Sequence, residues 1–171
     1  MRITLRPSLT TDGYIADLNG ECYSWINPED EARYDQAVKA CGCEIVGRKT
    51  YEQYKEDFAA RTDVVTFVYT NQSVFEDTDT IKFVGGPPED VIGRIEQMGF
   101  KEMIISGGGE LNGLFATHGL LDEVHLSIHP VSLGQGIKLF GSYDVKLRLE
   151  LLSVNTDVKG IVQTIYRVVK G

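Results

Sequence analysis

The sequence predicts one α/β domain over residues 1–171, with a central, mostly parallel sheet and helices on both of its faces. Two observations carry this prediction. As far as residue 129, short apolar runs typical of buried strands alternate with segments of helical periodicity. Beyond residue 145 come two long alternating runs, 145–155 and 161–169, joined around Asp157-Val158-Lys159-Gly160. That pattern predicts an antiparallel hairpin at the C-terminal end.

The first half of the chain supplies four strands and two helices. Residues 2–9 alternate before the turn residues Thr10-Thr11-Asp12-Gly13, which predicts an opening strand. Residues 28–40 predict a helix, because Pro28 and three acidic residues suit its first turn. Residues 44–46 form a short strand, and Gly47 separates it from a helix over 49–58. Apolar runs over 64–69 and 81–84 predict two further strands.

The second half continues the alternation. Residues 88–98 predict a helix whose inner face is apolar and whose C-terminal cap is Gly99. Residues 101–105 are a short apolar strand, and residues 111–118 form a helix that Gly119 ends. Residues 121–129 are the last strand before the hairpin.

Composition and charge narrow the class of protein. The 171 residues are 42% hydrophobic and 25% charged, which is ordinary for one globular domain. A formal net charge of −8 argues against a nucleic-acid partner. No apolar stretch is long enough to span a bilayer, and the N-terminus lacks a signal-peptide core. We therefore expect a cytoplasmic protein without a membrane partner, whose three cysteines are reduced structural thiols.

The most informative stretch is Ser106-Gly107-Gly108-Gly109-Glu110-Leu111, which lies between a predicted strand and a predicted helix. Glycines let bare backbone approach an anion, and a helix N-terminus offers unpaired N–H donors. A tight turn is the plain alternative, but this position favours a phosphate-binding loop. The Rossmann, P-loop and nucleophile-elbow motifs are absent, so the chain gives no support to those nucleotide-binding or hydrolase classes.

A second candidate anion site is Gly47-Arg48-Lys49-Thr50, at the end of a strand where a helix begins. Two cations at a helix N-terminus oppose the helix dipole, and a bound phosphate would explain them. Thr70-Asn71-Gln72 follows the next strand. Loops at the carboxyl ends of strands bind ligands in open α/β sheets, although a polar turn explains this triplet equally well.

A candidate acid lies near the only tryptophan. Trp25 precedes the helix that begins at Pro28, and Asp30 follows within its first turn. A partly desolvated carboxylate there would bind the nitrogens of a heterocycle, whereas an ordinary helix-start charge is the alternative. Glu29 and Glu31 leave the choice of carboxylate open. His125 and His129 share a strand face with period two, and we interpret them as strand residues, so we expect no metal.

Five motifs in order resemble the dihydrofolate reductase-like superfamily, and within it the C-terminal reductase domain of bifunctional riboflavin biosynthesis proteins (RibD) and its stand-alone relatives. Together they span essentially the whole chain. They are Thr11-Asp12-Gly13-Tyr14-Ile15-Ala16, Gly47-Arg48-Lys49-Thr50-Tyr51-Glu52, Ser106-Gly107-Gly108-Gly109, Gly119-Leu120-Leu121-Asp122-Glu123-Val124 and Leu133-Gly134-Gln135-Gly136.

The resemblance implies a three-layer fold with an eight-stranded sheet and NADPH across the strand ends. Residues 47–50 would bind the 2′-phosphate and pyrophosphate, residues 70–72 would lie near the adenosine, and Ile15 and Ala16 would approach the nicotinamide. Gly107, Gly108 and Gly109, followed by Glu110 and Leu111, would contact the phosphates and the nicotinamide side. Relatives carry a non-proline cis peptide in this glycine pair, and they often form homodimers.

The substrate half of the resemblance leaves two reductase variants open. Trp25-Ile26-Asn27-Pro28-Glu29-Asp30 matches the spacing of true dihydrofolate reductases, which makes Asp30 the acid and places Tyr34 on the pocket wall. Arg61 is only a loose match to the arginine that binds folate's glutamate. The riboflavin-type reductases carry a lysine and an acid where this chain has Tyr14 and Ser106.

We therefore expect an NADPH-dependent oxidoreductase that passes hydride to a small heterocycle. The substrate would be a riboflavin-type pyrimidine, as in a 5-amino-6-(5-phosphoribosylamino)uracil reductase, or a pterin such as dihydrofolate. A catalytically silent NADPH-binding or interaction protein is the alternative from another class.

Overall fold

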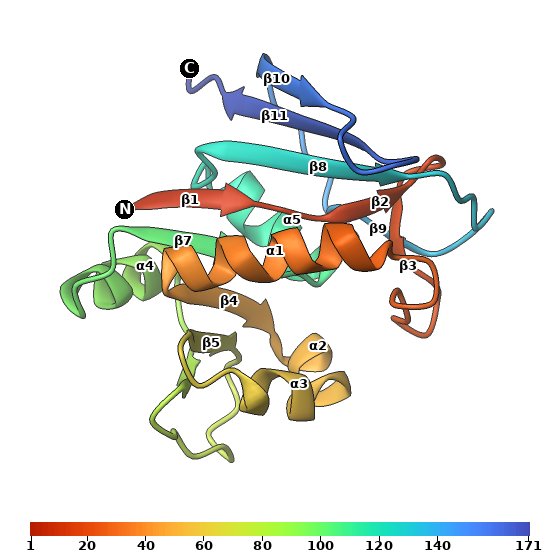
Figure 1. Ribbon diagram of the computed structural model, residues 1–171. Helices are drawn as coiled ribbons and strands as arrows, with labels where there is room; N and C mark the ends of the chain where they lie inside the picture. Colours follow the sequence, from red (N-terminus) through yellow and green to blue (C-terminus); the bar gives the residue numbers. More distant parts are fainter.

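A twisted sheet runs through the centre of the molecule (Figure 1), and the computed structural model describes residues 1–171. Its path contains, in spatial order, β10 (Leu149–Asn155), β11 (Val162–Val168), β8 (Glu123–His129), β1 (Arg2–Leu5), β7 (Glu102–Ile105), β4 (Cys43–Gly47), β5 (Val65–Tyr69) and β6 (Ile81–Val84). The strands from β8 to β6 are parallel, and β10 and β11 add the antiparallel hairpin. The predicted fold class and the predicted hairpin are confirmed.

The sheet has nine strands rather than eight because the opening strand is interrupted. A ninth strand, β2 (Ser8–Thr10), continues β1 and pairs with β8 alone. The interruption falls at Arg6-Pro7, where proline has no N–H to donate to a ladder. The sequence predicted one strand over 2–9, and the break leaves the Arg6 side chain between two strands.

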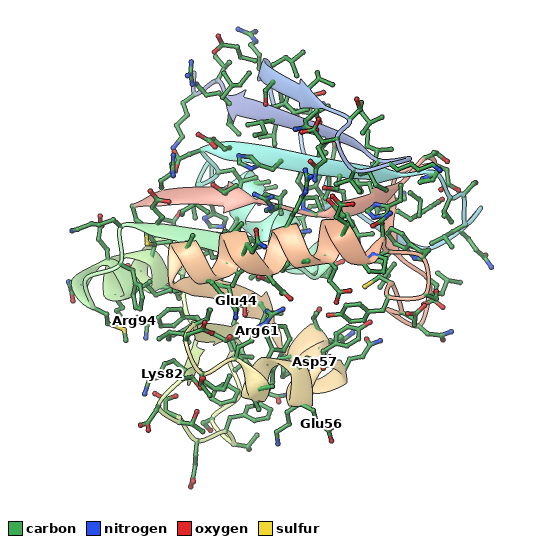
Figure 2. All side chains as sticks on the ribbon, viewed as in Figure 1. Glu44, Glu56, Asp57, Arg61, Lys82 and Arg94 are labelled. Atoms are coloured by element: carbon green, nitrogen blue, oxygen red, sulfur yellow. The ribbon has the colours of Figure 1, made fainter.

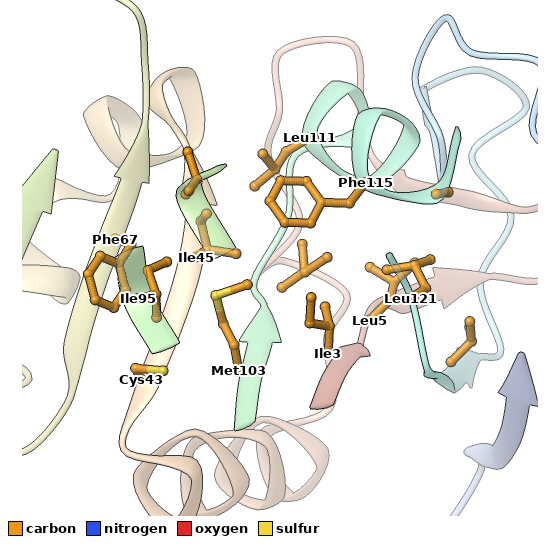
Figure 3. Close-up of a cluster of buried hydrophobic side chains, with 14 residues drawn as sticks. Ile3, Leu5, Cys43, Ile45, Phe67, Ile95, Met103, Leu111, Phe115 and Leu121 are labelled. Atoms are coloured by element: carbon orange, nitrogen blue, oxygen red, sulfur yellow. The ribbon is translucent and has the colours of Figure 1, made fainter. Parts of the chain in front are cut away.

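One face of the sheet carries the main apolar core. It is covered by α4 (Pro88–Gln97) and α5 (Gly109–Thr117), and fourteen buried residues form one cluster there (Figure 3). The two helices contribute pairs spaced four apart, Val91 with Ile95 and Leu111 with Phe115. That spacing places both members of each pair on the side of the helix that faces the strands. This face therefore supplies the largest share of the hydrophobic stabilisation.

Helix α1 (Pro28–Cys41) crosses the opposite face of the sheet (Figure 1), and polar side chains such as Glu44 are buried on this side. Asn27 caps the helix by accepting from the Glu29 N–H at 2.8 Å, and Gly42 ends it in the left-handed conformation. Only three buried apolar residues cluster beneath α1: Val38, Val64 and Ile104. Ala37 and Cys41 pack against this small cluster, and the interface also buries two carboxylates, Asp30 on α1 and Glu44 on β4.

Two local predictions need correction. The helix expected over 49–58 is two short helices, α2 (Arg48–Gln53) and α3 (Lys55–Ala60), because the backbone leaves the helical region at Tyr54. A two-stranded sheet of β3 (Tyr14–Ala16) and β9 (Ile137–Lys138) was not predicted. Its strands are too short to show a period in the sequence. No helix in the structure has both the length and the apolar character needed to cross a membrane.

Candidate active site at the carboxyl ends of β4 and β7

The two predicted anion-binding segments lie side by side. They follow β4 and β7, which are neighbours in the sheet. The Gly47 N–H donates to the Gly107 carbonyl at 2.9 Å, so the two loops are joined directly. A Cβ atom placed on Gly108 would lie 3.0 Å from the Thr50 hydroxyl. A side chain at residue 108 would therefore push the loops apart, which explains the glycine.

The glycine loop itself has unusual backbone angles. Gly107 has φ of 102° and Gly108 has φ of 26°, values that other residues rarely adopt. The cis peptide expected from the resemblance is not found, since every peptide bond is trans. Helix α5 starts at Gly109, and the first N–H groups of a helix have no partner within it. The loop therefore presents backbone donors beside Thr50.

The two cationic side chains near these loops differ in whether a carboxylate of the protein already binds them. Arg48 donates to both carboxylate oxygens of Glu52 at 2.8 and 2.7 Å, one turn along α2. Lys49 is exposed and takes part in no ion pair. Of the two predicted phosphate ligands, Lys49 is therefore available at once, while Arg48 has to leave Glu52.

Glu110 and Leu111 use their side chains elsewhere. Glu110 accepts from the backbone N–H and the hydroxyl of Ser142, both at 2.8 Å. Leu111 is 4% exposed and belongs to the main core. Both side chains face away from the predicted ligand, and only their backbone N–H groups remain to serve it. The structure thus assigns these two residues a structural role for their side chains.

Strand β3 is brought to the same place through β9. The Ala16 carbonyl lies close to Gly136, and Ala16 pairs with Ile137 of β9. The next residue, Lys138, packs its carbonyl against Gly109 so closely that a Cβ there would lie 2.6 Å away. Ile15 and Ala16 therefore lie on a ribbon that is fixed against the start of α5.

Two side chains of the predicted Thr70-Asn71-Gln72 loop already form hydrogen bonds within the protein. The Asn71 side chain accepts from the Gly86 N–H at 3.0 Å, and the Thr70 hydroxyl accepts from the Gln72 N–H at 3.1 Å. The first bond ties the loop after β5 to the loop after β6, and the second lies within the loop after β5. The Gln72 side chain is exposed and takes no part in this packing.

The predicted substrate residues divide into two groups. Asp30 is 3% exposed and accepts from Ser127 at 3.0 Å and from Gln163 at 2.6 Å. The ring of His129 lies between Asp30 and Trp25: its Nε2 is 3.5 Å from the carboxylate, and its ring meets the indole edge-on at 5.3 Å. The indole N–H is buried without a partner. The structure thus brings Trp25 and Asp30 together through His129, which the sequence analysis interpreted as an ordinary strand residue.

Tyr34 lies one turn along α1 and belongs to a second polar group. Its hydroxyl donates to Ser106 at 2.5 Å, and Ser106 donates to Glu44. Burial and the nearby Glu44 charge raise the pKa of Tyr34 well above its ordinary value. Because Ser106 immediately precedes Gly107, this chain connects α1 to the glycine loop.

Glu44 is the buried charged residue that sequence reasoning missed most clearly. It is fully buried on β4, where it accepts from Arg61 and Thr66, each at 2.9 Å. Arg61 also donates to Asp35 at 2.7 Å, so it is not free to bind a substrate carboxylate. The available signal was position, since interior strands of parallel sheets are buried on both faces and a charge there is unusual.

A pocket of about 610 Å³ opens between α1 and α3, beside this second group. Figure 2 shows Arg61 close to Glu44 beneath α1, with Asp57 on α3 nearby. Four carboxylates line the pocket: Glu31, Asp35, Asp57 and Asp63. Burial and the neighbouring Asp35 charge raise the pKa of Glu31. Lys39 and Arg61 also line the pocket, where they pair with Asp63 and Asp35, so the carboxylates exceed the cations by two.

Comparison with known proteins identifies the family. The family model of the RibD C-terminal domain matches residues 2–163. Protein YyaP of Bacillus subtilis (strain 168), described as uncharacterized, is 31% identical over 96% of this chain and 94% of its own length.

Solved structures agree with this assignment. A protein of Shewanella sp. PV-4, described as a riboflavin biosynthesis protein, is 25% identical with a TM-score of 0.85, covering 99% of this chain and all of that one. A dihydrofolate reductase from Enterococcus faecalis in complex with NADP(H) shares the fold at 15% identity, with a TM-score of 0.72 over 99% of this chain and 97% of its own. The chain belongs to the RibD C-terminal domain family and has the dihydrofolate reductase-like fold of that family's reductases.

Proposed function

We propose that this protein is an NADPH-dependent reductase that transfers hydride to a small heterocyclic substrate. The observation that carries the proposal is the junction of the two loops, in which Gly47 bonds Gly107 and Thr50 lies against Gly108. This junction sets backbone donors beside Lys49, which suits the pyrophosphate and 2′-phosphate of the cofactor. Bound NADPH would supply the hydride.

The chain's own residues would bind and orient both reactants. Residues 47–50 and the backbone of 107–111 would hold the phosphates, and Ile15 and Ala16 would lie beside the nicotinamide. Trp25, Asp30 and Tyr34 would line the substrate site. Asp30, or a water that it orients, would deliver the proton to the reduced ring.

Two substrates deserve a direct comparison. Family membership favours a riboflavin-type pyrimidine. The assembly of Trp25, His129 and Asp30 favours a pterin such as dihydrofolate, because the buried carboxylate and the unpartnered indole N–H suit a heterocycle's donors and acceptors. The acidic pocket beside Tyr34 disfavours a phosphate or glutamate tail in either case. The screen should therefore include dephosphorylated and tail-free forms.

The cofactor assignment is tested by titrating the protein with NADPH and NADH while following Trp25 and nicotinamide fluorescence. We expect saturation with NADPH and much weaker binding of NADH. Lys49→Ala should weaken NADPH binding by about 10- to 100-fold, since a charge-assisted contact is worth roughly 1.5–3 kcal/mol and 1.4 kcal/mol is tenfold. Arg48→Ala should have a smaller effect, because Arg48 must first leave Glu52.

Lys146→Ala is the matched control, because that lysine is 88% exposed and remote in sequence from the loops. If neither nucleotide binds, the family fold is present without the proposed activity. If NADPH binds and no substrate turns over, the catalytically silent alternative is favoured.

A further inference from the structure

The side chains around Glu44 form a hydrogen-bond chain with a fixed direction. The carboxylate uses its two oxygens differently: Oε1 accepts from Arg61 and Thr66, and Oε2 accepts from Ser106. An ionised carboxylate has no proton to donate. Ser106 must therefore donate its single hydroxyl proton to Glu44, which leaves the Ser106 oxygen as an acceptor only.

The same logic extends to Tyr34. Its hydroxyl contacts the Ser106 oxygen at 2.5 Å. Because the Ser106 proton is already donated to Glu44, Tyr34 has to donate its own proton to Ser106. The phenol proton thus points at Ser106. What remains of the Tyr34 hydroxyl is the lone-pair side of its oxygen, which accepts hydrogen bonds and cannot donate one.

Tyr34 lies where the direction of this hydrogen-bond chain can affect a ligand. The residue is only partly buried, lies one helical turn from Asp30 on α1, and bonds the residue that precedes the glycine loop. Tyr34 therefore stands between the two halves of the proposed site.

We propose that the chain Glu44–Ser106–Tyr34 makes the Tyr34 oxygen an obligatory hydrogen-bond acceptor in the substrate site. The site then selects a heterocycle that presents an amino group at this point, and it rejects one that presents a carbonyl oxygen. This rests on the proposed function in one respect, that Tyr34 lines the substrate site. Glu44 and Ser106 act as positioning residues.

One substitution should reverse the direction of these hydrogen bonds. In Glu44→Gln the amide oxygen has to face Arg61 and Thr66, which are both donors, so the amide NH₂ takes the place of Oε2 and faces Ser106. The NH₂ then donates to Ser106, Ser106 can donate to Tyr34, and the Tyr34 proton is released toward the ligand. A preference for amino groups should become a preference for carbonyl groups.

The test uses two pteridines of the same shape, 2,4-diaminopteridine and 2,4-dioxopteridine, titrated by calorimetry with and without NADPH. The informative quantity is the change in their affinity ratio, because Asp30 also favours amino groups and is the same in every variant. We expect Glu44→Gln to shift the ratio about tenfold toward the dioxo compound, the scale of one hydrogen bond gained or left unpaired. Tyr34→Phe should abolish the effect of Glu44→Gln when the two are combined.

Urea unfolding first establishes that each variant is folded. If Glu44→Gln does not fold, Ser106→Ala replaces it: this change frees the phenol proton, and the ratio should fall to that of Tyr34→Phe. A ratio within twofold of the wild-type value in the folded variant overturns the proposal, as does binding of neither ring. A changed ring preference without NADPH binding would refute the proposed function while supporting this inference. NADPH binding without a changed ring preference would refute this inference and leave the proposed function standing.

Discussion

At the scale of single residues, Asp30 combines a structural and a proposed catalytic role. Its carboxylate accepts from Ser127 and Gln163 and so ties α1 to β8 and β11. Asp30→Ala would leave these buried partners unpaired, which costs about 1–3 kcal/mol for each polar group. We expect urea unfolding to show a loss of roughly 2–6 kcal/mol in the free energy of unfolding.

Asp30→Asn separates the two roles. The Asn carbonyl oxygen can still accept from Ser127 and Gln163, since both donate to the same oxygen of Asp30. This variant should keep its stability within about 1 kcal/mol of wild type and lose turnover of whichever substrate the screen identifies. Full turnover in Asp30→Asn would assign the proton to another group.

The site residues that could be predicted from the sequence have local signals, whereas the others depend on partners that are distant in the chain. Glycines, cations and the lone tryptophan mark loops whose chemistry is local, so residues 47–50 and 107–109 were predicted and the structure joins them. Glu44 and Gln163 act through partners far away in the chain, 62 residues to Ser106 and 133 to Asp30. Such pairs follow from strand order, which a single sequence without repeats does not determine.

At the scale of elements, Asp12 holds the ribbon that carries Ile15 and Ala16. It accepts from Thr10 at 2.6 Å, from Ser132 at 2.8 Å and from the Gly134 N–H at 2.7 Å. The Thr10 hydroxyl, together with the donors of residues 132–134, holds the pKa of Asp12 far below its usual range. The end of β2 is thereby fixed to the loop that leads into β9.

This pKa shift predicts a pH dependence with a definite sign. A depressed pKa in the folded state means that the stabilisation is complete above the unfolded value of about 3.9 and is lost as the pH falls below it. Hydrogen exchange at Leu133 and Gly134 should therefore be unchanged from pH 7 to about 5, after correction for intrinsic rates, and lose protection in stronger acid. Asp12→Asn should show that loss already at pH 7, whereas Asp144→Asn should not, since Asp144 is 88% exposed. Equal protection in Asp12→Asn and wild type would contradict this role.

The elements themselves were mostly predictable, and the exceptions have physical causes. Long periodic segments such as 28–40 and 88–98 became helices close to their expected bounds. The break at Tyr54 and the short strands β3 and β9 depend on packing between distant segments rather than on periodicity. The break at Arg6-Pro7 was readable from proline alone.

At the scale of the whole molecule, the edge strand β10 leaves apolar surface uncovered. It pairs only with β11, and four of its side chains are 39–56% exposed: Leu149, Leu151, Leu152 and Val154. An exposed apolar edge strand is prone to pair with another chain unless something covers it. We propose that a second copy of this chain covers it, which makes the protein a homodimer.

Light scattering after size exclusion gives a direct test. Wild type should show twice the 19.0 kDa chain mass, and the double variant Leu151→Lys/Val154→Lys should show the single mass, because two charges would be desolvated at the contact. Leu18→Lys is the matched control: Leu18 is 65% exposed but lies outside the hairpin, so this variant should remain dimeric. A wild type that is monomeric at every concentration would contradict the dimer itself. A dimer that survives both lysines would place the interface on another surface, and β10 would then need a different cover.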